Sequence, residues 1–159
     1  MYEYYDKYKA AIGEQNKDAA ERWCRQFIWE IARCVFLITP QSVYRTIVVF
    51  RHAVGEELIV YPLMEEHLGQ KGKELADHDR AEHIDVKKHL ESLDKYISEG
   101  KVGTKEFDEK MRETYEHLKH HNDDEERDDL PMLEPKIGGE GSKSAAKHFK
   151  RTKVFAPTR

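Results

Sequence analysis

Apolar side chains recur at steps of three and four residues along two long segments, which is the spacing of helices buried along one stripe. The first segment begins after Gly72 and ends at Glu99-Gly100, and Thr104 is a candidate N-cap for the second. The two apolar stripes are Val86, Leu90, Leu93 and Ile97, followed by Phe107, Met111, Thr114 and Leu118. The pattern therefore predicts two long amphipathic helices.

Two shorter helices are predicted in the N-terminal part of the chain. The first begins at or before Met1 and ends at Gly13, and a capping box of Asp18 and Glu21 opens the second. The apolar stripe of the second helix is Trp23, Phe27 and Ile31. Strand signals are weak except over residues 43–50. Four antiparallel helices suit a chain of 159 residues, so we expect an all-α, antiparallel four-helix bundle.

The composition narrows the class of protein. Charged residues make up 36% of the chain and the hydrophobic class 38%, where about 25% and 45–50% are usual. No apolar run approaches the roughly 20 residues that cross a bilayer, and no basic segment followed by an apolar run indicates a secretory signal. The two cysteines form neither a disulfide framework nor a CxxC zinc motif. We therefore expect a cytoplasmic protein without a membrane partner.

Charge divides the chain at Pro135, which precedes a cluster of glycines and Ser142. Residues 136–159 contain seven Lys or Arg residues and one acid, whereas the whole chain has a net charge of −4. We expect a folded domain over residues 1–135 and a disordered, mostly unpacked basic tail over 136–159. Only Phe149 and Phe155 lie among the basic residues, which is too few for the aromatic interleaving that nucleic-acid binding would favour, so no nucleic-acid partner is expected.

A short internal repeat carries the candidate chemistry. Residues 52–65 align with residues 121–134 over fourteen positions without a gap. A histidine, two adjacent glutamates, a proline and a final glutamate coincide, which are His52/His121, Glu56/Glu125, Glu57/Glu126, Pro62/Pro131 and Glu65/Glu134. Each copy therefore contains a His-x-x-x-Glu pair, in which the two side chains lie one helical turn apart.

These pairs fall on the stripes that face the core. Extending the last apolar stripe past Leu118 reaches His121 and Glu125, and extending the preceding one back from Val86 reaches His83. Burying unpaired imidazoles and carboxylates would cost several kcal/mol, and a bound metal ion removes that cost. Helical bundles hold two-metal carboxylate sites with such a donor set. The candidate ligands are His52, Glu56, His83, His121 and Glu125, with Asp79 as a second-rank candidate.

The remaining ionisable groups near these stripes receive simpler interpretations. Asp79 has an alternative role as half of a charged pair with Arg80 near the start of its helix. The histidines that lie off the stripes or in loops are interpreted as surface residues, namely His67, His78, His89, His117, His120 and His148.

The His-x-x-x-Glu pairs, the segment DRAEH at 79–83 and the phrase HAVGEELIVYP at 52–62 resemble a hemerythrin-type HHE cation-binding domain of the kind common in fungi. The likeness covers most of residues 1–135, and the terminal segment FKRTKVFAPTR is also similar to that group. The resemblance implies a four-helix bundle around a non-haem di-iron site. Its implied ligands are His52, Glu56, His83, His121 and Glu125, with Glu56 and Glu125 as bridging carboxylates. From the residues alone, Mn and Zn suit the site as well as Fe.

The chain departs from the family pattern in two ways. The family's first-helix histidine has no counterpart here, and eighteen residues, 34–51, separate Arg33 from His52. Without these residues, Phe27 and Ile31 would continue directly into the stripe of His52, whereas Pro40 would break the helix. We interpret residues 34–51 as a translated intron combined with a late start codon, or as an isoform with the same effect, with a genuine inserted loop as the alternative.

The sequence therefore predicts a metal-binding module that holds one or two iron ions and binds or senses O₂, NO or iron itself. Oxygen carriers of the family have a further histidine one turn along the third helix, where Asp79 and Lys87 stand here, so a dedicated carrier is not expected. The alternatives are a di-iron redox enzyme acting on peroxide or ferrous iron, and a metal-impaired helical interaction domain.

Overall fold

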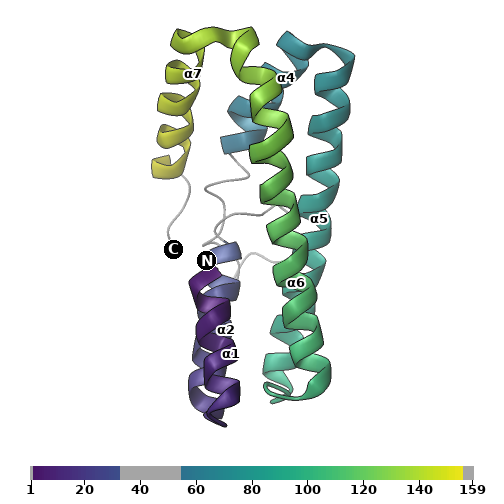
Figure 1. Cartoon of the computed structure of the whole chain (residues 1–159), viewed down its shortest axis with the longest axis vertical. Coiled ribbons are helices and arrows are strands. Elements are labelled where there is room, and N and C mark those ends of the chain that lie inside the picture. The colour runs from purple at the N-terminus through teal and green to yellow at the C-terminus, as the bar shows by residue number, and fades with distance from the viewer. Residues whose placement is uncertain (1, 33–54, 156–159) are drawn as a thin grey trace.

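The computed structural model describes residues 2–32 and 55–155, and side chains as far as residue 152. Within these ranges the chain forms helices and turns and no strand, so the all-α bundle is confirmed (Figure 1). Two π-helical turns, labelled η, lead into α4 and α7. The elements are α1 (Tyr2–Gly13), α2 (Lys17–Ala32), η1 (Glu56–Val60), α4 (Tyr61–Leu68), α5 (Gln70–Ser98), α6 (Lys105–Asp124), η2 (Glu125–Asp129) and α7 (Leu130–Phe155). The segment 34–51, with the strand signal over 43–50, lies outside the described residues.

Helices α5 and α6 are long antiparallel neighbours that run the length of the molecule (Figure 1). The α1–α2 hairpin packs beside the end where α5 finishes and α6 begins, and α4 and α7 lie toward the opposite end. The molecule therefore has two ends that share α5 and α6 but have different neighbours.

The end beside α1 and α2, which we call the apolar end, contains the larger core. Its buried side chains include every apolar residue of the two predicted stripes, together with Phe27 and Ile31 of α2. Aromatic rings add contacts across the helices, because Tyr5 stacks on Tyr115 with ring centroids 4.1 Å apart. The predicted stripes are thus confirmed as the core-facing surfaces.

The predicted helix boundaries hold at some positions and shift at others. The Thr104 Oγ1 atom accepts a hydrogen bond from the Phe107 backbone N–H at 3.3 Å, so Thr104 is the N-cap of α6 as predicted. The predicted capping box of α2 is wrong, because Asn16 Oδ1 accepts from the Ala19 N–H at 3.0 Å. Glu21 instead forms an ion pair with Arg25 one turn later.

Helix α5 begins at Gln70 rather than after Gly72, and Gly72 has a packing role. A Cβ atom at this position would lie 1.9 Å from the carbonyl oxygen of Met64. Only glycine therefore lets α4 and α5 approach this closely, a role that the expected helix start after Gly72 did not anticipate.

The basic segment differs from the expected unpacked tail as far as residue 155. It continues α7, with a sharp bend at Gly138, where φ is 67° and ψ is 175°. Beyond the bend the helix turns back toward the middle of the molecule (Figure 1), and the Phe149 ring lies against Gly55. The apolar side chains of Ile137 and Phe149 give this segment a face to bury. A domain boundary at residue 135 stays a prediction.

Candidate metal centre

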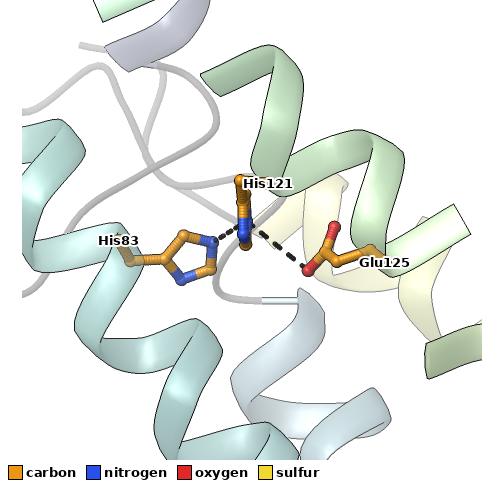
Figure 2. Close-up of side chains that lie close together, drawn as sticks. All are labelled: His83, His121 and Glu125. Atoms are coloured by element: carbon orange, nitrogen blue, oxygen red, sulfur yellow. Dashed lines mark hydrogen bonds and ion pairs between the residues drawn. The ribbon is translucent and has the colours of Figure 1, made fainter. Parts of the chain in front are cut away.

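Four of the five predicted ligands meet between α5, η1 and the junction of α6 with η2. The Nε2 atoms of His83 and His121 lie 3.1 Å apart. Glu125 Oε1 lies 3.5 Å from His121 Nε2, as Figure 2 shows, and Glu56 Oε2 lies 3.4 Å from His83 Nε2. His83, His121 and Glu56 are buried, and Glu125 is largely so. The fifth predicted ligand, His52, lies outside the described residues.

The geometry of the two histidines suits coordination of a common ion. The donor atoms of His83, His121 and Glu125 all lie within 4.8 Å of one another. A second group with the same property comprises Asp79, Glu82 and His121. Imidazole nitrogens and carboxylate oxygens are donors that iron, manganese and zinc accept.

Glu82 fixes the orientation of His121. Its Oε2 atom lies 2.7 Å from His121 Nδ1, so Nδ1–H donates to the carboxylate and the lone pair of Nε2 points toward His83. Sequence reasoning missed Glu82 because it lies beside the core stripe rather than on it. Its position three residues after Asp79, on the same side of the helix, was the available signal.

From Glu56 and Glu125 onward, the two copies of the repeat adopt the same local conformation. Each glutamate of the His-x-x-x-Glu pairs, Glu56 and Glu125, is the first residue of a π-helical turn. A proline, Pro62 or Pro131, follows six residues later and lacks the N–H that a regular helix would use. π-Helical turns within helices are frequent at functional sites. Here they give the two glutamates equivalent positions at the candidate centre.

Arg80 holds the elements around the centre together. Its guanidinium forms ion pairs with Glu57 at 3.0 Å, Glu65 at 3.2 Å and Asp77 at 2.8 Å. It also lies 5.0 Å from the centroid of the Tyr61 ring. Arg80 therefore ties α5 to η1 and α4. The alternative role of Asp79 as its partner in a charged pair is wrong.

Burial leaves the carboxyl groups of the centre in a poorly hydrated space. Burial raises the pKa of Asp79 to about 7, and the neighbouring carboxylate of Asp129 acts in the same direction. Burial raises the pKa of Glu125 to about 9, with Glu56 as the next cause. A cation placed among these groups favours their ionised forms. The donor set therefore fits a metal ion.

The hydroxyl of Tyr61 is a further buried polar group at this place. Among the described residues it has no hydrogen-bond partner. Burial raises its pKa, and the nearby carboxylates of Glu56 and Asp79 raise it further. A buried hydroxyl without a partner is costly, so this atom has a donor to offer to a ligand held at the centre.

A cavity of about 520 Å³ opens beside the carboxylates. Its walls are mainly apolar side chains from α4 and α7, which include Met64, Leu133, Ile137 and Phe149. Glu56, Asp79 and Glu125 also line the cavity. A molecule in this space would therefore reach the candidate ligands directly.

Four of the six histidines interpreted as surface residues are exposed, which are His67, His78, His120 and His148. The other two differ from that expectation. His89 and His117 are half-buried, and their ring centroids lie 5.5 Å apart.

Comparison with known proteins identifies the class to which this bundle and its cluster of donors belong. A family model described as the hemerythrin HHE cation binding domain matches residues 41–133. The chain is 40% identical, over 154 residues, to an uncharacterised hemerythrin-like protein of Schizosaccharomyces pombe. The alignment covers 97% of this chain and 64% of that relative. The chain therefore belongs to the hemerythrin HHE cation-binding family, and cation binding is the property that this family implies.

No solved structure matches the chain significantly. The chain spans 64% of the length of the yeast relative. Among the helices that the structure describes, none is both long and apolar enough to cross a membrane.

Proposed function

We propose that this protein binds a pair of non-haem iron ions through Glu56, His83, His121 and Glu125, with His52 as a fifth ligand. The observation that supports the proposal is the convergence of buried imidazole and carboxylate donors from three helical segments. Without a cation, such a cluster would be a large cost to a fold of this size.

The surrounding residues have distinct roles in this proposal. Glu82 holds the Nε2 lone pair of His121 toward the centre. Glu56 and Glu125 approach from two different helical segments and would hold the metal ions as carboxylate ligands. The Tyr61 hydroxyl is placed to donate a hydrogen bond at the edge of the centre. When bound, iron supplies reversible ligand binding and one-electron redox chemistry.

We propose that the physiological role is to bind or sense O₂, NO or iron itself. The apolar cavity beside the carboxylates supports this role, because small uncharged molecules enter an apolar space readily. A dedicated oxygen carrier is not proposed, because Asp79 and Lys87 stand one turn on either side of His83.

The test is the iron content of variants purified from cells grown with iron. His121→Ala and Glu125→Ala should each remove most of the iron, because both side chains belong to the convergent donor set. His117→Ala, one turn earlier on α6, and the exposed His120→Ala are the matched controls and should retain it. Colorimetric iron analysis on folded, monodisperse protein provides the measurement.

Two results would contradict the proposal. Equal iron loss from all four variants would mean that histidines bind iron as a loose surface group. An unmodified protein without stoichiometric iron would favour the metal-impaired interaction domain instead.

The cavity also favours a second candidate, a di-iron redox enzyme acting on peroxide or ferrous iron. Its volume of about 520 Å³ and its contact with three candidate ligands provide room for a substrate beside the metals. Iron-loaded protein should then consume peroxide faster than the same concentration of free iron. Leu133→Phe, which narrows the cavity, should slow turnover without changing iron content. Equal rates for protein and free iron would exclude this candidate.

A further inference from the structure

A second pair of histidines joins α5 to α6 outside the candidate centre. We call His89 and His117 the outer pair, and His83 and His121 the inner pair. The outer rings have centroids 5.5 Å apart and an interplanar angle of 31°. The two pairs are separated by six residues on α5 and four on α6, which corresponds to about 9 Å and 6 Å of helix.

Each outer histidine has a carboxylate one turn before it. Asp85 precedes His89 by four residues on α5, and Glu113 precedes His117 by four residues on α6. Both imidazoles lower the pKa of Asp85, although its hydrogen bond with Lys88 is the largest cause. The two imidazoles therefore meet across two antiparallel helices, and each has a carboxylate one turn away on its own helix.

The spacing of the outer rings suits two ligands of one tetrahedral ion. With zinc–nitrogen bonds of about 2.0–2.1 Å, the centroids of two coordinating imidazoles lie about 5 Å apart. The observed 5.5 Å is close to that value. The centroid distance therefore allows both rings to bind one ion.

His117 has an unused nitrogen at this place. Its Nε2 atom is buried and has no hydrogen-bond partner among the described residues. Burial lowers the pKa of His89, and the neighbouring His117 acts in the same direction. His89 therefore favours the neutral form that coordinates metal ions.

The lysines around the pair are weak competitors for the carboxylates. Asp85 pairs with Lys88 at 2.7 Å, and Glu113 pairs with Lys110 at 3.3 Å. The carboxylate and lysine side chains of both pairs are substantially exposed, and exposed ion pairs contribute little to stability. A divalent ion can therefore recruit either carboxylate after a side-chain rotation.

We propose that the outer pair, with Asp85 or Glu113 as a third ligand, binds one late first-row divalent ion such as Zn²⁺. Imidazole suits zinc, copper, iron and nickel, and the carboxylate-rich inner centre is already the proposed iron site. The bound ion would link α5 to α6 at a surface that no part of the iron proposal uses.

The test is a calorimetric titration of the full-length, iron-loaded protein with Zn²⁺. Unmodified protein should take up one Zn²⁺ per chain while it retains its iron. His89→Ala and His117→Ala should each weaken zinc binding by at least about tenfold, because each removes one ligand. Iron content should not change in either variant, which separates this proposal from that of the iron centre.

His120, on the same helix α6 as His117, provides a matched control. The exposed His120 pairs with Asp124 at 2.8 Å and therefore offers one imidazole and one carboxylate without a second imidazole. His120→Ala should leave zinc binding unchanged. Equal weakening by His120→Ala, no zinc uptake by the unmodified protein, or release of iron by zinc would each overturn the proposal.

A second measurement begins with the unmodified protein. In ¹⁵N-labelled protein, Zn²⁺ should shift the imidazole nitrogen resonances of His89 and His117 and leave those of His120 in place. Glu113→Gln and Asp85→Asn then identify the third ligand, because at least one should weaken zinc binding. If neither does, the carboxylate part of the proposal is wrong.

Discussion

The two ends of the bundle share α5 and α6 but bury different kinds of side chain on them. On α5 the core-facing stripe is apolar from Val86 to Ile97 and ionisable at Asp79 and His83. On α6 it is apolar from Phe107 to Leu118 and ionisable at His121. Because the helices are antiparallel, both stripes change character at the same level. The metal-centre end therefore begins where the apolar end stops.

This difference separates two sources of stability. Burial of apolar side chains stabilises the apolar end. Aromatic rings of α1, α2 and α6 also contact one another there. At the metal-centre end, the buried carboxyl groups of Asp79 and Glu125 oppose folding when they ionise. The apolar end should therefore be stable without metal, whereas the other end should depend on it.

The largest effect is expected from a cavity in the apolar end. Phe107 is fully buried there, and Phe107→Ala should lower the free energy of unfolding by about 3–5 kcal/mol. The loss should be the same with and without iron, as measured by urea unfolding of both forms. Met132→Ala, at a partly exposed position of α7, is the control with little effect. A loss that occurs only in the iron-loaded protein would break the distinction between the ends.

Removal of iron should affect the opposite end. At a hundredfold excess over its dissociation constant, a ligand stabilises the folded protein by about 2.7 kcal/mol, and a chelator should remove this contribution. Hydrogen exchange should then accelerate in η1, α4 and η2 and stay unchanged in α1 and α2. Uniform acceleration along the chain would show that both ends depend on the metal.

The metal-free protein should also lose stability as the pH rises. The folded-state pKa of Glu125 is raised to about 9 and that of Asp79 to about 7, so the folded state holds protons that the unfolded state releases near pH 4. Stability should therefore fall from about pH 5 through pH 9. Urea midpoints across this range measure the decline, which Glu125→Gln should reduce. A stability that rises over this range would contradict the assigned directions.

Periodicity alone located much of the fold and of the candidate centre. The apolar stripes of α5 and α6, the N-cap Thr104 and the positions of His83, His121 and Glu125 follow from steps of three and four residues. These features depend on one helix at a time. A pattern along a single helix is therefore sufficient to find them.

The features that the sequence did not reveal depend on contacts between elements. Glu82 orients His121, which lies on a neighbouring helix. Gly72 leaves room for the carbonyl oxygen of Met64, which lies on α4. His89 and His117 looked like surface residues because their contact joins two helices. The return of α7 follows from a bend at Gly138 that composition marked only as a turn.

Glu82 provides a smaller test at the metal-centre end. Glu82→Gln should weaken iron binding by about 10–100-fold, because a neutral amide holds the His121 imidazole less firmly than a carboxylate does. The exposed Glu91→Gln on the same helix is the matched control. If Glu82 has only a structural role, Glu82→Gln should lower thermal stability without changing the iron affinity. If Glu82 positions His121, the variant should weaken iron binding and shift the ring-nitrogen resonances of His121. Unchanged affinity and resonances would show that Glu82 does not position His121.

The smallest expected effect lies at the far end of α6. Thr104→Ala removes the oxygen that accepts the Phe107 N–H and should lower the free energy of unfolding by about 1 kcal/mol. Thr104→Ser should restore most of it, because the serine hydroxyl can accept the same bond. His121 lies 17 residues along the chain, or about 26 Å of helix, so iron affinity should not change. Urea unfolding and iron titration of both variants provide the measurement. A loss of iron affinity in Thr104→Ala would mean that α6 transmits changes at the apolar end to the metal centre, and that the two ends do not act independently.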